Sequence, residues 1–320
     1  MTTTKTKIII DTDPGVDDAL AICMALNSPE LRVKALTTVF GNVSVEQATQ
    51  NALFLSQFAH DLPVYTGAAA PLIIPPNGYP AHVHGQGGFG DFPLPTMPAD
   101  LLAQSLPAAD YLVQATREEP GDITLVALGP LTNLALALQL DPSMTQRVKQ
   151  VVVMGGAAHT TGNVSPVAEA NMYADPHAAD LVFGADWPIT MVGLDVTEKT
   201  ILNEALLATL PDDTQGQFLK QASAFYIDFY RQAMGLDGCM VHDPSTIAYL
   251  LNPALFNHEP GRVRVIAEGL AIGQTAIAPP HLEFMQAGWE DVPVNNICTD
   301  VDSQGVLDTL LSALRNRQTA

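Results

Sequence analysis

The feature that most constrains the fold is a repeated alternation of short β-branched runs with longer amphipathic stretches. The apolar runs predict buried strands at residues 7–10, 33–39, 123–128, 151–154 and 189–194. Helical spacing follows at residues 17–26, 45–59, 131–140, 176–183, 215–233 and 244–251. This order is typical of parallel strands joined by crossover helices. The less regular C-terminal third adds predicted strands at 262–267 and 294–299 and a helix at 303–315.

The composition favours one large core. Of the 320 residues, 47% are hydrophobic and only 15% are charged, and no stretch has the composition of a linker. We therefore predict a single α/β domain over residues 1–320, with an open, mostly parallel, Rossmann-like sheet flanked by helices. In such sheets ligands bind at the carboxyl edge of the strands, so we expect the active site there.

The charge balance limits the possible partners. With 34 acidic and 14 basic residues, the net charge of -20 repels a phosphate backbone and an anionic membrane surface. We therefore expect neither a nucleic acid polymer nor a membrane as a partner. A small neutral molecule or a metal cation suits this field better, although high acidity alone most often serves solubility.

Cysteine usage and the N-terminal residues bear on the compartment. Cys23, Cys239 and Cys298 are too widely spaced for a zinc site or a disulfide framework. The apolar run before the first acidic residues is only three isoleucines, too short for the core of an export signal. We therefore predict a cytoplasmic protein with reduced thiols.

The most informative junction between a strand and a helix is the segment DTDPGVDDA, residues 11–19. It places four carboxylates, those of Asp11, Asp13, Asp17 and Asp18, directly after an apolar strand. Carboxylates this close repel one another, and a divalent cation is the simplest neutraliser. Helix capping explains one or two of them, because acidic residues favour a helix N-terminus. A metal site is therefore the better interpretation.

Two known motifs compete for this segment. An EF-hand loop needs an oxygen ligand at its fifth position and Glu at its twelfth, where this chain has Gly15 and Ile22. A dehalogenase-type phosphatase would use Asp11 as nucleophile and Asp13 as acid and base. Such enzymes carry Thr or Val where Gly15 stands, so this function remains only an alternative.

A segment rich in Pro and Gly, residues 71–98, predicts a long loop of the kind that forms lids or binding loops. It contains His82 and His84. It also matches G-x-G-x-x-G from Gly85 to Gly90, but no strand precedes the match and Asp91-Phe92-Pro93 prevents a following helix. We therefore do not predict a dinucleotide site.

The segment DTDPGVDDA resembles the N-terminal signature of the calcium-dependent nucleoside hydrolases, which include inosine-uridine-preferring and pyrimidine-preferring enzymes. Further similar segments follow in order over nearly the whole chain: TTVFGNV, VHGQGGFG, LVALGPLTNLA, VVVMGGAAHTTGNVSPVAEANMYADPHAA, MVGLDVT and VHDP. The resemblance implies hydrolysis of the N-glycosidic bond of ribonucleosides to ribose and free base, in nucleoside salvage. It also implies a homodimer or homotetramer.

Carried over by position, the resemblance implies that calcium is held by Asp13, Asp18, the backbone carbonyl of Leu128 and Asp243. Calcium takes about 6 to 8 oxygens, which leaves positions for water and for the ribose hydroxyls. Asp13 is then the general base that activates the calcium-bound water. From the sequence alone, Asp243 is as readily a helix cap, because Asp-Pro recurs at Asp141 and Asp175.

The resemblance also implies a set of ribose-binding residues: Asp17, Asn42, Met154, Asn163, Glu169 and Asn171. Amides and carboxylates suit a polyol, because they bond both its donors and its acceptors. In isolation, the Gly- and Asn-rich stretch 155–171 favours turns. Family members commonly carry Phe where this chain has Ala170, which alters the packing around the sugar.

The group that faces the nucleobase is drawn from His84, His242, Tyr226 and Tyr230. His242 is the leading candidate for the acid that protonates the leaving base, because histidine titrates near neutral pH. The other interpretation is that His242 only packs beside Asp243. Tyr226 and Tyr230 are four residues apart on a predicted helix and share a face, which is more often a core face. A non-catalytic nucleoside-binding protein is a further alternative, and base preference is not predicted.

Overall fold

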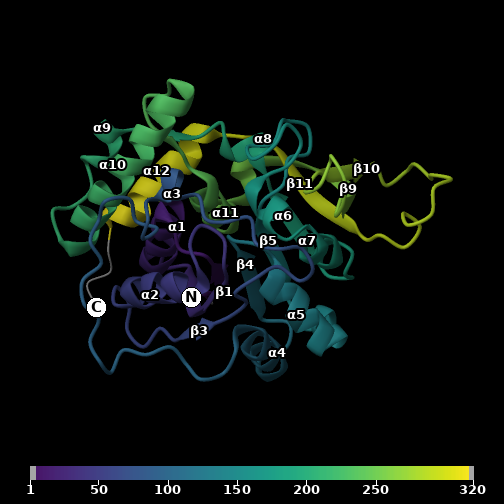
Figure 1. Cartoon of the computed structure of the whole chain (residues 1–320), viewed down its shortest axis with the longest axis horizontal. Helices are drawn as coiled ribbons and strands as arrows, with labels where there is room; N and C mark the ends of the chain where they lie inside the picture. Colours follow the sequence, from purple (N-terminus) through teal and green to yellow (C-terminus); the bar gives the residue numbers. More distant parts are fainter. Residues whose placement is uncertain (1–4, 317–320) are drawn as a thin grey trace.

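A nine-stranded sheet forms the centre of the computed structural model, which describes residues 5–316 (Figure 1). Residues 1–4, which belong to the N-terminal segment considered above, and residues 317–320 fall within the predicted domain but lie outside the described residues. The strands of the sheet are β1 (Thr6–Thr12), β2 (Leu31–Thr38), β3 (Val64–Thr66), β4 (Ile123–Ala127), β5 (Gln150–Met154), β6 (Ile189–Val192), β9 (Phe256–Val265), β10 (Thr275–Ala278) and β11 (Val294–Val301). A separate two-stranded sheet pairs β7 (Ile201–Leu202) with β8 (Cys239–Met240).

The strand order confirms the predicted fold class. Six parallel strands follow the order β3-β2-β1-β4-β5-β6, the 3-2-1-4-5-6 order of Rossmann-type sheets. Beside β6 lies the parallel strand β11, and β9 and β10 extend the sheet in antiparallel pairing. The strand order reverses between β1 and β4, and the crevice at their carboxyl ends is where such sheets bind ligands.

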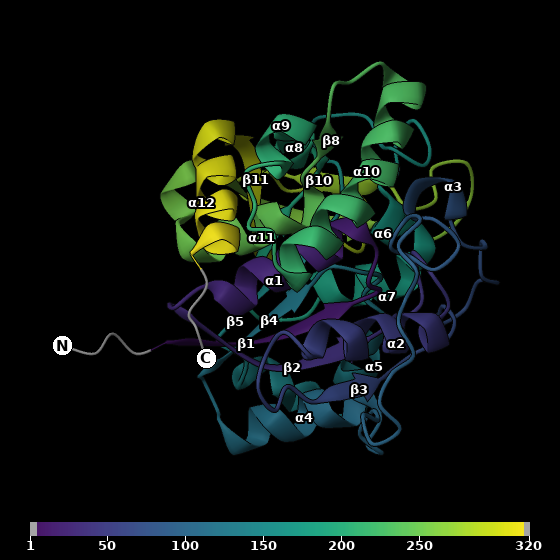
Figure 2. The same cartoon turned by 90° about the vertical axis from the view of Figure 1, so that its left-hand side faces the viewer.

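Helices cover both faces of the sheet (Figure 2). One face carries α1 (Val16–Asn27), α2 (Val45–Ser56), α11 (His242–Leu251) and α12 (Ser303–Arg315), with α10 (Thr214–Met234) packed against α1. The opposite face carries α4 (Ala108–Glu118), α5 (Thr132–Leu140) and α7 (Pro176–Phe183).

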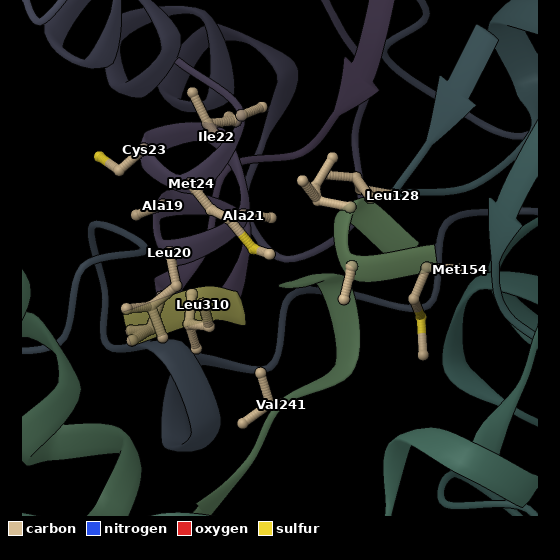
Figure 3. Packing of buried hydrophobic residues seen from close by; sticks show 14 of the residues in the cluster. Ala19, Leu20, Ala21, Ile22, Cys23, Met24, Leu128, Met154, Val241 and Leu310 are labelled. Carbon is tan, nitrogen blue, oxygen red and sulfur yellow. The ribbon is translucent and has the colours of Figure 1, made fainter. Parts of the chain in front are cut away.

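The first strand shows why both faces are filled. Successive side chains of a strand point to opposite faces, so Ile8 and Ile10 enter the core beneath α1 while Ile9 enters the other core. All three are at most 1% exposed. In the first core, Leu20 of α1 lies near Leu310 of α12 (Figure 3). The continuous apolar run in the sequence reflects this two-sided burial.

Several elements differ from the sequence prediction. The strand predicted at 189–194 ends at Val192, because the chain turns at Gly193 into the single-turn helix α8 (Leu194–Thr197). The strand predicted at 262–267 is the end of a longer β9. The prediction missed β3, β10 and the crossover helix α4. It also missed α3 (Ala81–His84), α6 (Ala170–Ala174), α9 (Glu204–Leu207) and the 3-10 turns Pro142–Gln146 and Pro253–Leu255.

The missed elements have physical causes. β3 has only three residues, too few to show a period, and exists through its pairing with β2. The shortest helices have four or five residues and depend on caps and tertiary packing. The predicted loop at 71–98 is otherwise confirmed, since α3 is its only regular element in the described structure. Within residues 5–316, no helix has the length and apolarity to cross a membrane.

Candidate active site at the ends of strands β1 and β4

The acidic segment forms the turn between β1 and α1. Asp18 caps the helix: its Oδ2 accepts a hydrogen bond from the Gly15 amide at 2.8 Å, and its Oδ1 accepts one from the Thr12 hydroxyl. Capping therefore accounts for Asp18 but not for Asp13 or Asp17. Of the four carboxylates in the segment, only one is used in this way.

Asp13 is seated between two glycines. Its Oδ2 accepts a hydrogen bond from the Asn42 amide at 2.6 Å. A Cβ atom at Gly41 or Gly129 would lie 2.0 or 2.4 Å from an oxygen of this carboxylate, so both positions need glycine for close approach. The other oxygen, Oδ1, is buried and has no hydrogen-bond partner among the described residues.

Burial and mutual repulsion dominate the electrostatics of the cluster formed by Asp13, Asp17, Asp18 and Asp243, hereafter the acidic cluster. Each of the four is at most 5% exposed. Burial, and then repulsion from Asp18, raises the pKa of Asp17 to about 7. The pKa of each of the other three is raised as well, with burial again the largest cause. No Lys or Arg of residues 5–316 forms an ion pair with the cluster.

A cation would offset this repulsion. Ligand oxygens of Asp17, Asp18 and Asp243 all lie within 4.8 Å of one another. Asp13 is not part of that group, so the predicted ligand set is only partly assembled here, and Asp17 stands in it where the resemblance implied Asp13. The donor chemistry fits a hard divalent cation, because every donor is an oxygen and Asp17 Oδ1, like Asp13 Oδ1, lacks a hydrogen-bond partner within the described chain.

Three of the predicted ribose residues, Met154, Glu169 and Asn171, gather near the ends of β4 and β5. The Asn171 side-chain amide donates to the carbonyl oxygens of Leu128 at 2.7 Å and Met154 at 3.1 Å, so it bridges the two strand ends. The Glu169 carboxylate caps α6 and accepts from the amides of Asn171, Met172 and Gly156. Asn163 lies at the exposed rim, where its Oδ1 accepts from the Ala170 amide at 3.0 Å.

The predicted base-side residues form a continuous chain of side chains that begins at the acidic cluster. The Tyr226 hydroxyl donates to Asp17 Oδ2 at 3.4 Å and lies 3.3 Å from the Tyr230 hydroxyl. The latter lies 2.9 Å from His242 Nε2, and His242 Nδ1 lies 2.8 Å from the Thr197 hydroxyl. The interpretation that His242 merely packs beside Asp243 is therefore incomplete.

His84 lies at the other side of Tyr226. The two rings stack with their centroids 5.2 Å apart. His84 Nδ1 accepts a hydrogen bond from the Val16 amide at 3.3 Å, which requires that nitrogen to be unprotonated. Burial lowers the pKa of His84 to about 3 and that of His242 to about 4. The expectation that His242 titrates near neutral pH is therefore wrong for the ligand-free protein, because burial penalises the charged ring.

Three side chains that shape the site were not predicted from the sequence: Thr12, Asn51 and Thr197. The Asn51 side-chain amide donates to the carbonyls of Pro14 and Gly87, both at 2.8 Å, and so ties the acidic turn to the glycine-rich loop. A Cβ at Gly88, whose φ is 90°, would lie 2.6 Å from this amide. Two glycines of the G-x-G-x-x-G match are also needed for close packing within the protein, because a Cβ at Gly85 would lie 2.4 Å from the Gly90 carbonyl oxygen and one at Gly90 would lie 2.5 Å from Phe225. Thr197 belongs to the MVGLDVT segment, but the resemblance implied no role for it.

Comparison with known proteins agrees with this geometry. Residues 8–308 match the family model described as inosine-uridine preferring nucleoside hydrolase. The chain is 40% identical to uridine nucleosidase 1 of Arabidopsis thaliana, over 96% of this chain and 93% of that protein. It is 42% identical to the non-specific ribonucleoside hydrolase RihC of Escherichia coli, over 82% of this chain and 84% of that protein.

Solved structures give the same result. A plant nucleoside hydrolase superposes with a TM-score of 0.93 at 40% identity, covering 98% of this chain and 99% of that one. A purine-preferring ribonucleoside hydrolase from Gardnerella vaginalis has a TM-score of 0.89 at 32% identity, covering 97% and 98%. The predicted N-glycosyl hydrolase is confirmed, and neither the phosphatase nor the non-catalytic binding protein is supported. The chain belongs to the inosine-uridine preferring nucleoside hydrolase family.

Proposed function

We propose that this nucleoside hydrolase cleaves ribonucleosides, uridine among them, at the acidic cluster. The observation that carries the proposal is a group of four buried carboxylates, located where the strand order reverses, with which no Lys or Arg of the described chain forms an ion pair. Uridine is included because the Arabidopsis relative is named a uridine nucleosidase. Preference between purine and pyrimidine bases is not part of the proposal, since relatives with both kinds of name match the chain.

We propose that calcium is the cation, held by Asp13, Asp18, the Leu128 carbonyl and Asp243. The all-oxygen donor set supports this choice. The Leu128 carbonyl oxygen already accepts from Asn171, but a carbonyl has two lone pairs and can serve both partners. Asp17 lies within the same group of oxygens and is available as a further ligand. When bound, the cation orients a water molecule, lowers its pKa and binds the ribose hydroxyls.

Asp13 is the proposed general base. One of its oxygens is fixed by the Asn42 amide, and the other receives no hydrogen bond from residues 5–316 and can accept the proton of the attacking water. Attack at the anomeric carbon proceeds through a ribosyl cation with oxocarbenium character. The neighbouring carboxylates of Asp17 and Glu169 stabilise that positive charge electrostatically.

We further propose that the ribose is bound by Asp17, Asn42, Met154, Asn163, Glu169 and Asn171. The hydrogen bonds of Asn171 to Leu128 and Met154 support this assignment, because they hold polar groups from two strands at one edge. Ala170 is exposed at the start of α6, so a small side chain replaces the aromatic ring common in the family at this edge.

His242, Tyr226 and Tyr230 are the proposed route for the proton that the leaving base takes up. Because the buried histidine is neutral in the ligand-free protein, the leaving base takes its proton from a hydroxyl of this chain. That hydroxyl regains a proton through its neighbour in the chain, and solvent water replaces the last one. His84, held neutral by the Val16 amide, is a proposed contact of the base.

The proposed cellular setting is the cytoplasm, within nucleoside salvage, and the proposed assembly is a homodimer or homotetramer. The burial of Cys23, Cys239 and Cys298 agrees with a reducing compartment, where buried thiols stay unmodified. We also propose one domain over residues 1–320, which the single nine-stranded sheet supports.

The experiment that tests the proposed function measures free ribose after incubation of the purified protein with inosine, uridine or the ribosyl ether of nitrophenol. We expect ribose from uridine and from the nitrophenyl riboside. A protein that binds uridine but releases no ribose from any of the three substrates, in the presence of calcium, would contradict the proposal.

A further inference from the structure

The single-turn helix α8 touches both halves of the site, although none of its residues belongs to the proposed ligand sets. It follows β6 directly and packs against α11, the helix that begins at His242 (Figure 1). Its sequence, LDVT, carries two buried polar side chains, Asp195 and Thr197. Each of them makes hydrogen bonds to a different half of the site.

Asp195 holds the sugar side. Its Oδ2 accepts from the Ala158 amide at 2.8 Å and its Oδ1 from the His159 amide at 2.7 Å, while the residue is only 6% exposed. These two amides begin the loop that leads to Asn163 and Glu169. A carboxylate that accepts from two consecutive amides fixes the direction of the chain between them.

Thr197 holds the base side. Its side chain is fully buried, and its hydroxyl lies 2.8 Å from His242 Nδ1 while His242 Nε2 lies 2.9 Å from the Tyr230 hydroxyl. Partners on both ring nitrogens fix the orientation of an imidazole. Thr197 therefore holds the ring in the plane in which Nε2 meets the Tyr230 hydroxyl.

We propose that Asp195 and Thr197 are positioning residues, through which α8 fixes the ribose loop and the imidazole of His242 relative to each other. Both act through other side chains or backbone and touch no substrate. This inference rests on the proposed function, because it assigns separate effects to the sugar side and to the leaving-group side of the same reaction.

The base-side test compares Thr197→Val with Thr197→Ser and Thr200→Val. Thr200 is an equally buried threonine three residues further on, and its hydroxyl has no hydrogen-bond partner within residues 5–316, so it controls for the substitution itself.

We expect Thr197→Val to lower kcat on uridine by about 10²-fold with little change in KM, and to leave the nitrophenyl riboside, whose leaving group needs no proton, near the wild-type rate. Thr197→Ser should restore most of kcat. Equal losses on both substrates, no loss on either, or a similar loss in Thr200→Val would overturn the base-side assignment.

The sugar-side test uses Asp195→Asn, which replaces one acceptor oxygen with a donor. The matched control is Asp302→Asn, because Asp302 caps α12 through the Gly305 amide. A displaced loop affects every riboside, so kcat/KM should fall by about 10²-fold on uridine and the nitrophenyl riboside alike, while the control stays near wild type. Thermal unfolding verifies that each variant is folded, and Asp195→Ser, which keeps one short acceptor, replaces Asp195→Asn if that variant does not fold.

The outcomes separate the two proposals. If the wild-type protein hydrolyses neither substrate, the proposed function fails. If it hydrolyses both and folded Asp195 variants retain full activity, or lose activity on uridine alone, the sugar-side assignment of α8 is wrong while the proposed function stands.

Discussion

The acidic cluster and the base-side chain of Tyr226, Tyr230 and His242 are adjacent, yet they are built differently. Most of the acidic cluster comes from one turn, and backbone amides fix its side chains. The base-side chain comes from α10 and α11, and its members contact one another through side-chain hydroxyl and ring atoms. Burial acts on the two regions in opposite directions, raising carboxyl pKa values in the first and lowering the pKa of His242 in the second. The first region is therefore suited to binding a cation and the second to holding neutral proton carriers.

The largest expected effect tests the acidic cluster. Asp13→Asn keeps the shape and an oxygen donor but cannot accept a proton, so turnover of every riboside should fall by about 10² to 10⁴-fold. The rate is measured at saturating calcium with bound metal counted, because weaker calcium binding could mimic the loss of a base. A variant that holds calcium and turns over near the wild-type rate would leave Asp13 a structural ligand, and Asp17 would become the candidate base.

A smaller and more selective effect is expected on the base side. His242→Ala should lower kcat on inosine and uridine by about 10²-fold, because their bases leave more readily when protonated, and should spare the nitrophenyl riboside. The ratio of the two rates is measured on one enzyme preparation. Equal losses on both substrates would mean that His242 binds or packs and does not serve proton transfer.

Removal of the contact between the acidic cluster and the base-side chain should lower the rate less than either change above. Tyr226→Phe removes the hydroxyl that lies between Asp17 and Tyr230 while it keeps the ring that stacks on His84. We expect a loss of about 10-fold on uridine, since the ring packing is retained and only the two long hydrogen bonds of the hydroxyl are lost. Steady-state kinetics check this value. A rate unchanged from wild type would mean that protons reach the base by another route.

The smallest expected effect is on stability, in protein stripped of metal. Asp17 has a folded pKa of about 7 against an ordinary value of 3.8, so the folded state binds more protons than the unfolded state between about pH 4 and 7. Its contribution to stability is therefore lost as pH rises through that window. Relative to Asp17→Asn, the melting temperature of the wild-type protein should fall by roughly 5 °C from pH 4 to pH 7.

His84 and His242 change the stability with pH in the opposite direction. Their folded pKa values of about 3 and 4 lie below the ordinary 6.5, so their contribution is gained as pH rises toward 6.5. Calcium binds the carboxylates in their ionised form. At saturating calcium, the loss of stability that Asp17 causes with rising pH should therefore disappear, and the gain of stability from His84 and His242 should remain. A wild-type protein that follows the pH dependence of Asp17→Asn without metal would show that Asp17 is ionised in the apo state, and the contrast between the two regions would be wrong.

The same contrast explains how much could be predicted from the sequence. The fold and the acidic turn were predictable because apolar periodicity and a local run of carboxylates leave direct traces in the order of residues. The role of Thr197 was not, because it depends on a contact with His242, 45 positions away in the sequence. The titration of His242 was mispredicted because burial, which a sequence does not display, outweighs the ordinary pKa of the ring.

The ligand set illustrates the remaining limit. The resemblance assigned Asp13 to the metal, whereas the carboxylate oxygens that lie within 4.8 Å of one another belong to Asp17, Asp18 and Asp243. The positions of the carboxylates within the turn do not determine which of them faces Asp243. Asp243 lies in the first turn of α11, more than 200 positions further along the chain.

The most direct test of the account is the release of ribose from uridine by one preparation of wild-type enzyme, before metal removal, after treatment with a tight chelator, and after calcium is restored. Elemental analysis verifies the metal content at each stage. We expect activity to be abolished in the stripped protein and mostly recovered with calcium, because the buried carboxylates need a cation to bind sugar and water in their ionised form. Full activity with calcium verified absent would contradict the assignment of the acidic cluster as a metal-dependent hydrolytic site.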